Sequence, residues 1–233
     1  MSPANAIQDA VLDKLPGAMV QTAGGILEKF WLFLLLAFAL SLLFRFLRSP
    51  KMKGRFGEAA VSVGALKRLD PKFYRVFNDL FLPRPDGKGT TQIDHVVLSP
   101  FGIFVIETKN YAGWIFGDED SRFWTQVIYR KKCRFQNPLH QNALHVSALV
   151  KATGLPRDCF HNLVYFVGAA TLKTSLPPQV MTRGLASYIR WHREQVISPM
   201  DLAWAVTVLN STLPATPEQR RAHHMHVTVG ARR

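Results

Sequence analysis

Two carboxylates and one ammonium lie in two neighbouring apolar segments, where together they could form a metal-dependent catalytic centre. Asp94 lies in the first segment, and Glu107 and Lys109 lie in the second. A β-hairpin with its loop at Ser99–Gly102 would place Asp94 opposite Glu107, with Cβ atoms about 4.5 to 5.5 Å apart, and Lys109 on the same face. Two carboxylates in contact repel each other unless a proton or a cation intervenes, and hard divalent cations bind through oxygen atoms. The spacing therefore predicts a metal site on one face of a sheet.

A salt bridge is the simpler interpretation of the same three residues. Lys109 would then neutralise Glu107, while Asp94 would cap a turn. Residue types and spacing alone leave both interpretations open.

The rest of the chain shows the alternation of strands and helices that could position such a site. Apolar, β-branched and aromatic runs predict strands at 73–82, 92–98, 103–109, 114–116, 123–129 and 162–167. Helical patterns occur at 54–69, 138–153, 185–193, 199–209 and from 217 onward. The strands around Asp94 and Glu107 are apolar on both faces, which is typical of central strands covered on two sides. Because Pro100 disfavours a primed two-residue turn, we expect a four-residue hairpin loop with the same register.

Composition indicates a globular protein with an anionic partner. The chain has 233 residues, 48% of them hydrophobic, and a formal net charge of +13. Two cysteines are too few for a disulfide framework and lack the spacing of a zinc site, which favours a reducing compartment. The charge favours nucleic acid or the inner face of a membrane as the partner, and charge alone does not choose between them.

An apolar stretch at 27–47, preceded by a short segment at 1–26, predicts a transmembrane helix. Residues 30–44 include no charged side chain, and about 20 apolar helical residues span a bilayer. A buried core helix and a cleaved signal peptide are weaker alternatives, the latter because no basic segment precedes the stretch. The basic residues that follow the uncharged run 30–44, before the first acid, are Arg45, Arg48, Lys51, Lys53 and Arg55. The positive-inside rule then predicts a single-pass protein of a bacterial-type inner membrane, with the main domain in the cytoplasm.

A second cluster of cations interleaves with aromatic residues in the stretch 129–135. This composition suits phosphate contacts and base stacking, although a solvated strand or loop fits it equally well. The predicted nucleic-acid-binding residues are Arg130, Lys131, Lys132 and Arg134.

Several motifs, in order, make the region from Gly54 to Val167 resemble the NERD, or nuclease-related, domain. The motifs are Gly57-Glu58, Gln92 to Val97 (QIDHVV), Gly102 to Tyr111 (GIFVIETKNY), Gly113, Trp124, Asn137-Pro138 and Gln141. NERD domains are assigned to the PD-(D/E)-x-K restriction-endonuclease-like superfamily. The resemblance therefore implies an α/β fold with an α-β-β-β-α-β core and a mixed central sheet flanked by helices. We expect this domain at 54–168 and a mainly helical extension at 169–233.

The resemblance also implies roles for five residues. Asp94 and Glu107 match metal ligands, and Glu58 matches an additional acidic residue that can complete the metal site. Lys109 matches the lysine of the E-x-K pair, and Gln141 matches a polar position on the following helix. The implied cofactor is Mg²⁺ or Mn²⁺, which would polarise the scissile phosphate while Lys109 orients the attacking water.

These observations favour a membrane-anchored, metal-dependent nuclease that hydrolyses phosphodiester bonds in DNA or RNA. The alternative is a catalytically inactive NERD module that binds nucleic acid or a membrane-associated protein. A lipid-binding anchor protein is a second alternative, but it leaves the carboxylate pair unexplained. The presence of all four charged residues, Glu58, Asp94, Glu107 and Lys109, favours the enzyme.

Overall fold

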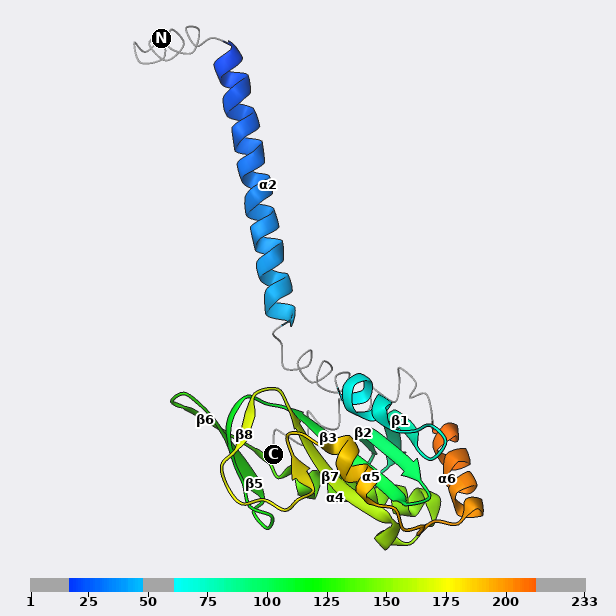
Figure 1. Cartoon of the computed structure of the whole chain (residues 1–233). Coiled ribbons are helices and arrows are strands. Elements are labelled where there is room, and N and C mark those ends of the chain that lie inside the picture. The colour runs from blue at the N-terminus through cyan, green and yellow to red at the C-terminus, as the bar shows by residue number, and fades with distance from the viewer. Residues whose placement is uncertain (1–16, 48–60, 213–233) are drawn as a thin grey trace. The chain divides into compact units, whose positions relative to one another are not determined.

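The computed structural model describes residues 17–47 and 61–212, which fall into two units, Met1–Met52 and Lys53–Arg233 (Figure 1). The first unit contributes helix α2, Gly17–Leu47, whose described side chains are all exposed. Among the described residues, no helix is long and apolar enough to cross a membrane. The membrane span predicted for 27–47 is therefore not confirmed.

Sheet A, a mixed five-stranded sheet, forms the centre of the second unit. Its strand order is β1-β2-β3-β7-β9, in which β1, β2 and β3 pair antiparallel and β3, β7 and β9 pair parallel. The strands are β1 Arg75–Pro83, β2 Thr90–Ser99, β3 Gly102–Asn110, β7 Phe160–Val167 and β9 Val180–Met181. The predicted mixed central sheet is confirmed.

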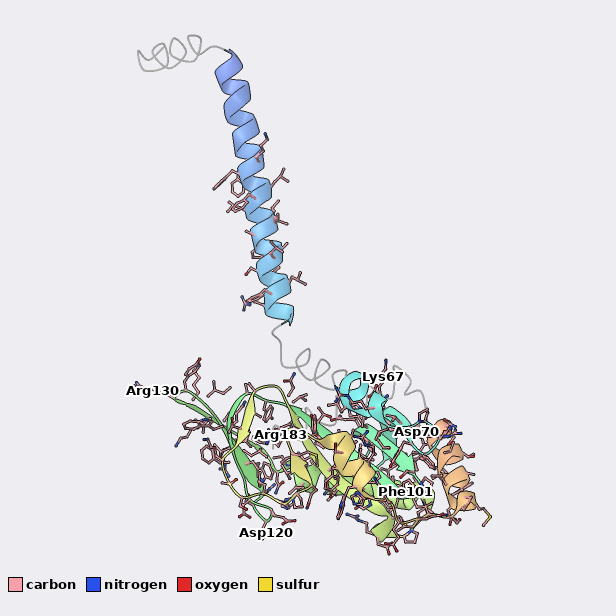
Figure 2. The ribbon with its side chains drawn as sticks, in the orientation of Figure 1. Lys67, Asp70, Phe101, Asp120, Arg130 and Arg183 are labelled. Atoms are coloured by element: carbon pink, nitrogen blue, oxygen red, sulfur yellow. The ribbon has the colours of Figure 1, made fainter. Side chains whose placement is uncertain are left out.

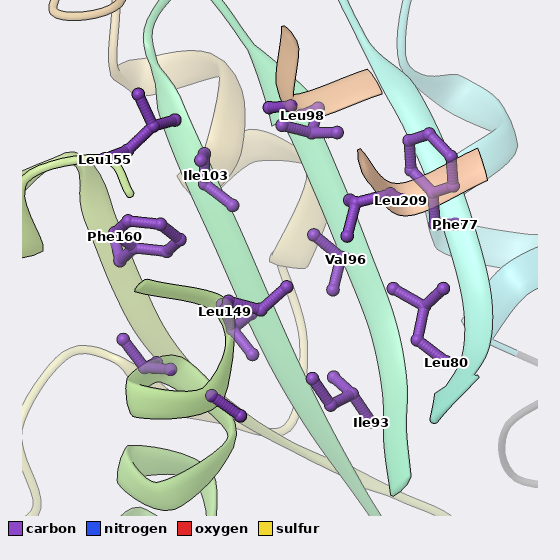
Figure 3. Packing of buried hydrophobic residues seen from close by; sticks show 14 of the residues in the cluster. Phe77, Leu80, Ile93, Val96, Leu98, Ile103, Leu149, Leu155, Phe160 and Leu209 are labelled. Atoms are coloured by element: carbon purple, nitrogen blue, oxygen red, sulfur yellow. The ribbon is translucent and has the colours of Figure 1, made fainter. Parts of the chain in front are cut away.

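Helices cover both faces of sheet A. Helices α4, Pro138–Thr153, and α6, Pro199–Ser211, pack against one face, where apolar side chains fill the space between helix and strands (Figure 3). The opposite face packs against the π-helical turn Val61–Ala65, the 3-10 turn Leu66–Arg68 and helix α5, Leu185–Trp191. The helix predicted at 54–69 is thus described only from Val61 onward, as two short turns. The site strands are buried on both sides, as their apolar pattern predicts.

Helix α4 occupies the predicted range 138–153. Asn137 caps its N-terminus by accepting a hydrogen bond from Leu139 N (2.9 Å), and Pro138 is its first residue. Gly154 ends the helix in the left-handed conformation with a φ of 73°. A capping Asn, Pro at the first position and Gly after the last turn are the residues that these positions favour.

The side chain of Asn142 joins α4 to the seam between β3 and β7. Its amide donates hydrogen bonds to the carbonyl oxygens of Val105 (2.8 Å) and Leu163 (3.0 Å), and lies 2.7 Å from Asn162 Oδ1. Asn142 is fully buried. Because a buried amide is costly without partners, these bonds set the position of α4 above the sheet, and with it the position of Gln141.

Four further strands form a second sheet, sheet B, which the sequence did not predict as a separate layer. Its order is β6-β5-β4-β8. One face packs on the body of the domain, where Trp124 stacks on Phe166 with ring centroids 6.2 Å apart. The strands are β4 Gly113–Phe116, β5 Phe123–Ile128, β6 Lys131–Gln136 and β8 Ala170–Leu172.

Strands β8 and β9 lie where the sequence predicted none, and β6 falls in the stretch 129–135, whose composition fits a solvated strand or loop as well as a nucleic-acid contact. Three of the six residues of β6 are cations, and the strand pairs with β5 along its whole length. Strands β8 and β9 have three and two residues, too few for any periodicity. The segment after 168, expected to be mainly helical, therefore supplies one strand to each sheet as well as α5 and α6.

The β2–β3 hairpin has the predicted register, with pairs from Ser99↔Gly102 to His95↔Ile106. Its loop has two residues, Pro100 and Phe101, and not the expected four. The Ser99 hydroxyl stabilises the short loop, because it accepts a hydrogen bond from Phe101 N (3.2 Å) and donates one to Gly102 O (2.9 Å). Gly102 adopts a φ of 138°, which other residues rarely adopt.

Substitution of Asn142 should destabilise the fold. In Asn142→Ala, the buried carbonyl oxygens of Val105 and Leu163 lose a donor, which should lower the free energy of unfolding by about 1 to 3 kcal/mol. Urea denaturation of the full chain measures this change. Ser147→Ala, at an exposed position of the same helix, should change stability by less than about 0.5 kcal/mol. Equal stabilities of the two variants would contradict the anchoring role of Asn142.

Candidate active site

Counted from the hairpin loop, regular pairing between β2 and β3 ends at His95, the residue next to Asp94. The last pair is His95↔Ile106, and the Asp94 side chain then accepts a hydrogen bond from the backbone N–H of Thr108 at 2.8 Å. On the other side of β2, Asp79 interrupts β1 with a positive φ of 58°, a conformation that is uncommon outside glycine. The predicted Asp94–Glu107 pair is therefore not part of the ladder, and the Asp94 carboxylate instead binds the β3 backbone at Thr108, the residue after Glu107.

Glu107 is a buried carboxylate with a partner on each oxygen. It is only 3% exposed. Its Oε1 accepts a hydrogen bond from Lys109 Nζ at 2.6 Å, and its Oε2 lies 3.2 Å from His145 Nε2. Lys109 Nζ donates a second hydrogen bond to Gln141 Oε1 at 2.9 Å. Strand β3 therefore supplies the charged pair, and α4 supplies a polar partner to each member of it.

Burial and the neighbouring charges shift the pKa values of Glu107 and Lys109 in opposite directions. Burial alone would raise the pKa of the Glu107 carboxyl, but the Lys109 ammonium and the His145 hydrogen bond together hold it below its usual value. Burial would lower the pKa of Lys109, but the Glu107 carboxylate, with a smaller contribution from Asp94, raises it. Both groups therefore stay charged at neutral pH, and Asp94 is close enough to act on the same ammonium.

His145 is a site residue that the sequence reasoning missed. It lies one helical turn after Gln141 on α4, so both side chains project from the same face toward β3. Its Nδ1 lies 2.8 Å from Thr91 Oγ1, and both residues are buried. The four-residue spacing from Gln141 was the signal that could have found it. His145 links Glu107 to Thr91 of β2 and orients the carboxylate from the side opposite Lys109.

The structure brings together four of the five residues that the sequence assigned to the centre: Asp94, Glu107, Lys109 and Gln141. The fifth, Glu58, lies outside the described residues. The contact of Lys109 with Glu107 is the one that the salt-bridge interpretation predicts, whereas Asp94 binds the backbone of β3 and does not cap a turn. Within 17–47 and 61–212, no group of three or more His, Cys, Asp or Glu side chains could hold a metal ion.

The donor chemistry of the described residues nevertheless suits a hard divalent cation. Asp94 and Glu107 offer carboxylate oxygens, and Mg²⁺ usually takes one or two protein carboxylates and keeps several waters. Both Glu107 oxygens are engaged by protein groups. Each of these oxygens has a second lone pair, so a cation could bind Glu107 beside its present partners or in place of Lys109. Lys109 has a second partner, Gln141, to which it could remain bonded.

The four predicted nucleic-acid-binding cations lie on the β5–β6 hairpin of sheet B. Arg130, Lys131, Lys132 and Arg134 are all exposed, and Arg130 lies at the hairpin end in Figure 2. Tyr129, next to Arg130 in the two-residue loop, is 99% exposed and adopts a positive φ of 52°. None of the four forms a side-chain ion pair with a described acid. We name these four residues the cationic ribbon.

Comparison with known proteins identifies the segment that carries the site. Residues 53–167 match the family model of the nuclease-related domain, NERD. The chain carries a NERD domain. The match includes all five residues assigned to the centre and confirms the resemblance seen in the motifs.

The chain is also similar to a curated protein, whose name states no function. An uncharacterized protein of Bacillus anthracis is 51% identical to the chain over 100 residues, which are 43% of this chain and 46% of that protein. The chain thus covers less than half of that relative. No solved structure matches the chain.

His95, the neighbour of Asp94, is a buried histidine whose protonation should make the stability of the fold depend on pH. Its Nδ1 lies 2.7 Å from Asn78 Oδ1, and its Nε2 has no hydrogen-bond partner among the described residues. Burial lowers the pKa of His95 to about 4, although the carboxylates of Glu107 and Asp79 oppose the shift. The structure therefore favours the neutral imidazole.

We expect the free energy of unfolding to decrease as pH falls from about 6.5 to about 4. In this range the unfolded chain binds a proton at His95 and the folded chain does not, which should cost about 3 kcal/mol, since one pKa unit corresponds to about 1.4 kcal/mol. Denaturation of His95→Leu across this range should show a shallower slope. The slope of Ser147→Ala, which changes no titratable group and lies at an exposed position of α4, should match that of wild type. An unchanged slope in His95→Leu would contradict the prediction.

Proposed function

We propose that this protein is a metal-dependent nuclease that hydrolyses phosphodiester bonds in DNA or RNA. The observation that carries the proposal is the arrangement around β3 of the NERD domain. There, Asp94, Glu107 and Lys109 lie together, and Gln141 and His145 of α4 hold the two members of the charged pair. A buried ion pair is weak evidence for stability, because apolar residues of similar size often serve as well. Its retention beside a third charged residue supports a chemical role.

Each described residue has a distinct task in the proposed reaction. Asp94 and Glu107 would hold Mg²⁺ or Mn²⁺, and Glu58 is proposed to complete this ligand set. The bound cation would polarise the scissile phosphate and lower the pKa of a coordinated water. Lys109 would offset negative charge that develops on the phosphate. Gln141 would hold the Lys109 ammonium in position if the Glu107 carboxylate binds the cation. His145 would fix the orientation of that carboxylate through its Oε2.

A catalytically inactive NERD module remains the second candidate, and one observation favours it. Both Glu107 oxygens and the Asp94 carboxylate already have protein partners, so the described carboxylates are hydrogen-bonded without a metal ion. In this case the cationic ribbon would still bind nucleic acid, and the charged pair would only support the fold.

Metal binding and cleavage by charge variants distinguish the two candidates. We expect Asp94→Asn and Glu107→Gln to bind Mg²⁺ or Mn²⁺ more weakly and to lose cleavage by roughly 100-fold or more. Lys109→Ala should bind the metal at least as well as wild type, because a competing cation is gone, and should still fail to cleave. Calorimetric titration and cleavage of single-stranded and duplex DNA and RNA measure these effects.

Asp86→Asn provides the matched control. Asp86 is an exposed acid outside the candidate site, and its carboxylate lies 2.8 Å from the Arg84 guanidinium. The variant should retain full metal affinity and cleavage. Under the inactive-module alternative, Lys109→Ala leaves a buried carboxylate short of its cation, and the fold should lose about 3 to 5 kcal/mol with no rescue by metal. Wild-type protein that binds neither cation at millimolar concentration, even with nucleic acid present, would contradict the nuclease proposal.

We also propose that α2 anchors the protein in a bacterial-type inner membrane, with the NERD domain in the cytoplasm. Side chains at five successive positions from Leu32 to Leu36 are 39 to 66% exposed, and five successive positions cover the whole circumference of a helix. A helix that is apolar on all sides requires an apolar environment. The basic residues at 45–55 support the proposed orientation.

Extraction from cell membranes tests the anchor. The full chain should remain in the membrane pellet after alkaline carbonate treatment and dissolve only in detergent, since its apolar helix would lose its lipid environment in water. External protease should leave the NERD domain intact in spheroplasts. Release by carbonate would contradict the anchor, and cleavage of the domain in intact spheroplasts would contradict the orientation.

A further inference from the structure

The outward side of sheet B carries three exposed aromatic rings. Trp114 and Phe116 of β4 are 53% and 36% exposed, and Phe123 of β5 is 41% exposed. Ile115, which lies between Trp114 and Phe116, and Trp124, which follows Phe123, point to the opposite side and are fully buried. We name the exposed side, defined by Trp114, Phe116 and Phe123, the aromatic face. The alternation of a strand explains this arrangement, because the inner side chains pack in the core and the outer rings face away from it.

Strand register places cations on the same face. Val127 pairs with both Trp114 and Lys132, and Thr125 pairs with both Phe116 and Arg134, so each aromatic of β4 shares a row with a cation of β6. The Arg134 guanidinium lies 4.8 Å from the centroid of Phe123, and Lys173 Nζ lies 4.8 Å from that of Trp114.

Acidic residues are confined to one end of sheet B. Its four strands contain no Asp or Glu. The acids Asp118, Glu119 and Asp120 lie in the loop between β4 and β5, and Figure 2 shows Asp120 at the opposite end of the sheet from Arg130. A polyanion would therefore be favoured over the strands and toward the β5–β6 hairpin, and disfavoured at the acidic loop.

We propose that the aromatic face binds single-stranded nucleic acid, with unpaired bases stacked on Trp114, Phe116 and Phe123 and phosphates on Lys132, Arg134 and Lys173. This inference rests on the proposed function and names its substrate class. Every base offers a π-face to an aromatic ring, but a duplex hides these faces inside its stack. Interleaved rings and cations with no carboxylate suit an unpaired strand, whereas a duplex would use only the cations.

The aromatic face is also close to the candidate active site along the chain. Trp114 follows Lys109 by five residues, which span at most about 18 Å even when fully extended. A strand held on the aromatic face would therefore lie near β3. Binding there would raise the local concentration of single strands at Asp94 and Glu107.

Binding measurements on the full chain, with a chelator present to prevent cleavage, test the proposal. The probes are a labelled single strand and a duplex of the same sequence, each titrated over a range of salt concentrations. Trp114→Ala should weaken single-strand binding roughly 5- to 150-fold, with an unchanged salt slope and unchanged duplex binding. Trp114→Phe should retain most of the affinity. The double variant Lys132→Ala, Arg134→Ala should weaken both probes and flatten the salt slope.

Trp191→Ala is the matched control, because Trp191 is 78% exposed on α5, away from sheet B. It should bind both probes as wild type does, and melting curves should show all variants folded. If wild type binds single strands and Trp114→Ala binds them equally well, the aromatic face is wrong while the nuclease proposal stands. If wild type binds neither probe, the aromatic face is overturned, whereas the nuclease proposal is decided by metal titration and cleavage with metal present. If Trp114→Ala instead abolishes binding to anionic vesicles and leaves nucleic-acid binding intact, the face is a lipid surface and the proposal is overturned.

Discussion

The structure around the site depends on one constraint, which is that strand β3 carries the Glu107 carboxylate into a buried position. Such a charge needs a cation and hydrogen bonds, because water is excluded. Lys109 supplies the cation from two residues further along the strand, and His145 supplies a hydrogen bond from α4. The position of His145 depends in turn on α4, which Asn142 joins to the carbonyl oxygens of β3 and β7. Burial of one carboxylate thus sets requirements on two strands and a helix.

The chain passes from β3 of sheet A into β4 of sheet B through only two residues. After Asn110 the chain leaves sheet A, and Tyr111 packs edge-on against Phe135 of β6 at 4.8 Å. Gly113, with a φ of 81°, then begins β4 where an added Cβ would lie 2.4 Å from Val127 O, so only glycine fits. The charged residues of β3 and the aromatic residues of β4 are therefore parts of one continuous segment. This continuity gives a physical reason to expect that a polymer bound on sheet B also reaches the site.

The contacts of Lys109 are compatible with both candidate functions, the nuclease and the inactive module. In both, the ammonium neutralises Glu107 at 2.6 Å. They differ in what the ammonium does when a divalent cation competes for that carboxylate. Gln141 gives Lys109 a partner that does not depend on Glu107, an arrangement that a simple structural ion pair does not require. The NERD assignment of residues 53–167 and the exposed cations of the β5–β6 hairpin are compatible with either behaviour.

The sequence by itself determined the elements whose signals are local. Alternation and a short loop set the β2–β3 register, and Asn137, Pro138 and Gly154 set the ends of α4. The motifs also placed Asp94, Glu107, Lys109 and Gln141 in one centre. Only the tertiary structure showed that the Asp94 carboxylate binds Thr108 N, that His145 and Thr91 complete the surroundings of Glu107, and that β8 and β9 join two separate sheets. These features depend on contacts between residues far apart in the chain, and strands of two or three residues have no pattern of their own. Local periodicity therefore specifies an element and its faces, whereas the partners of a buried charge are decided by which elements pack together.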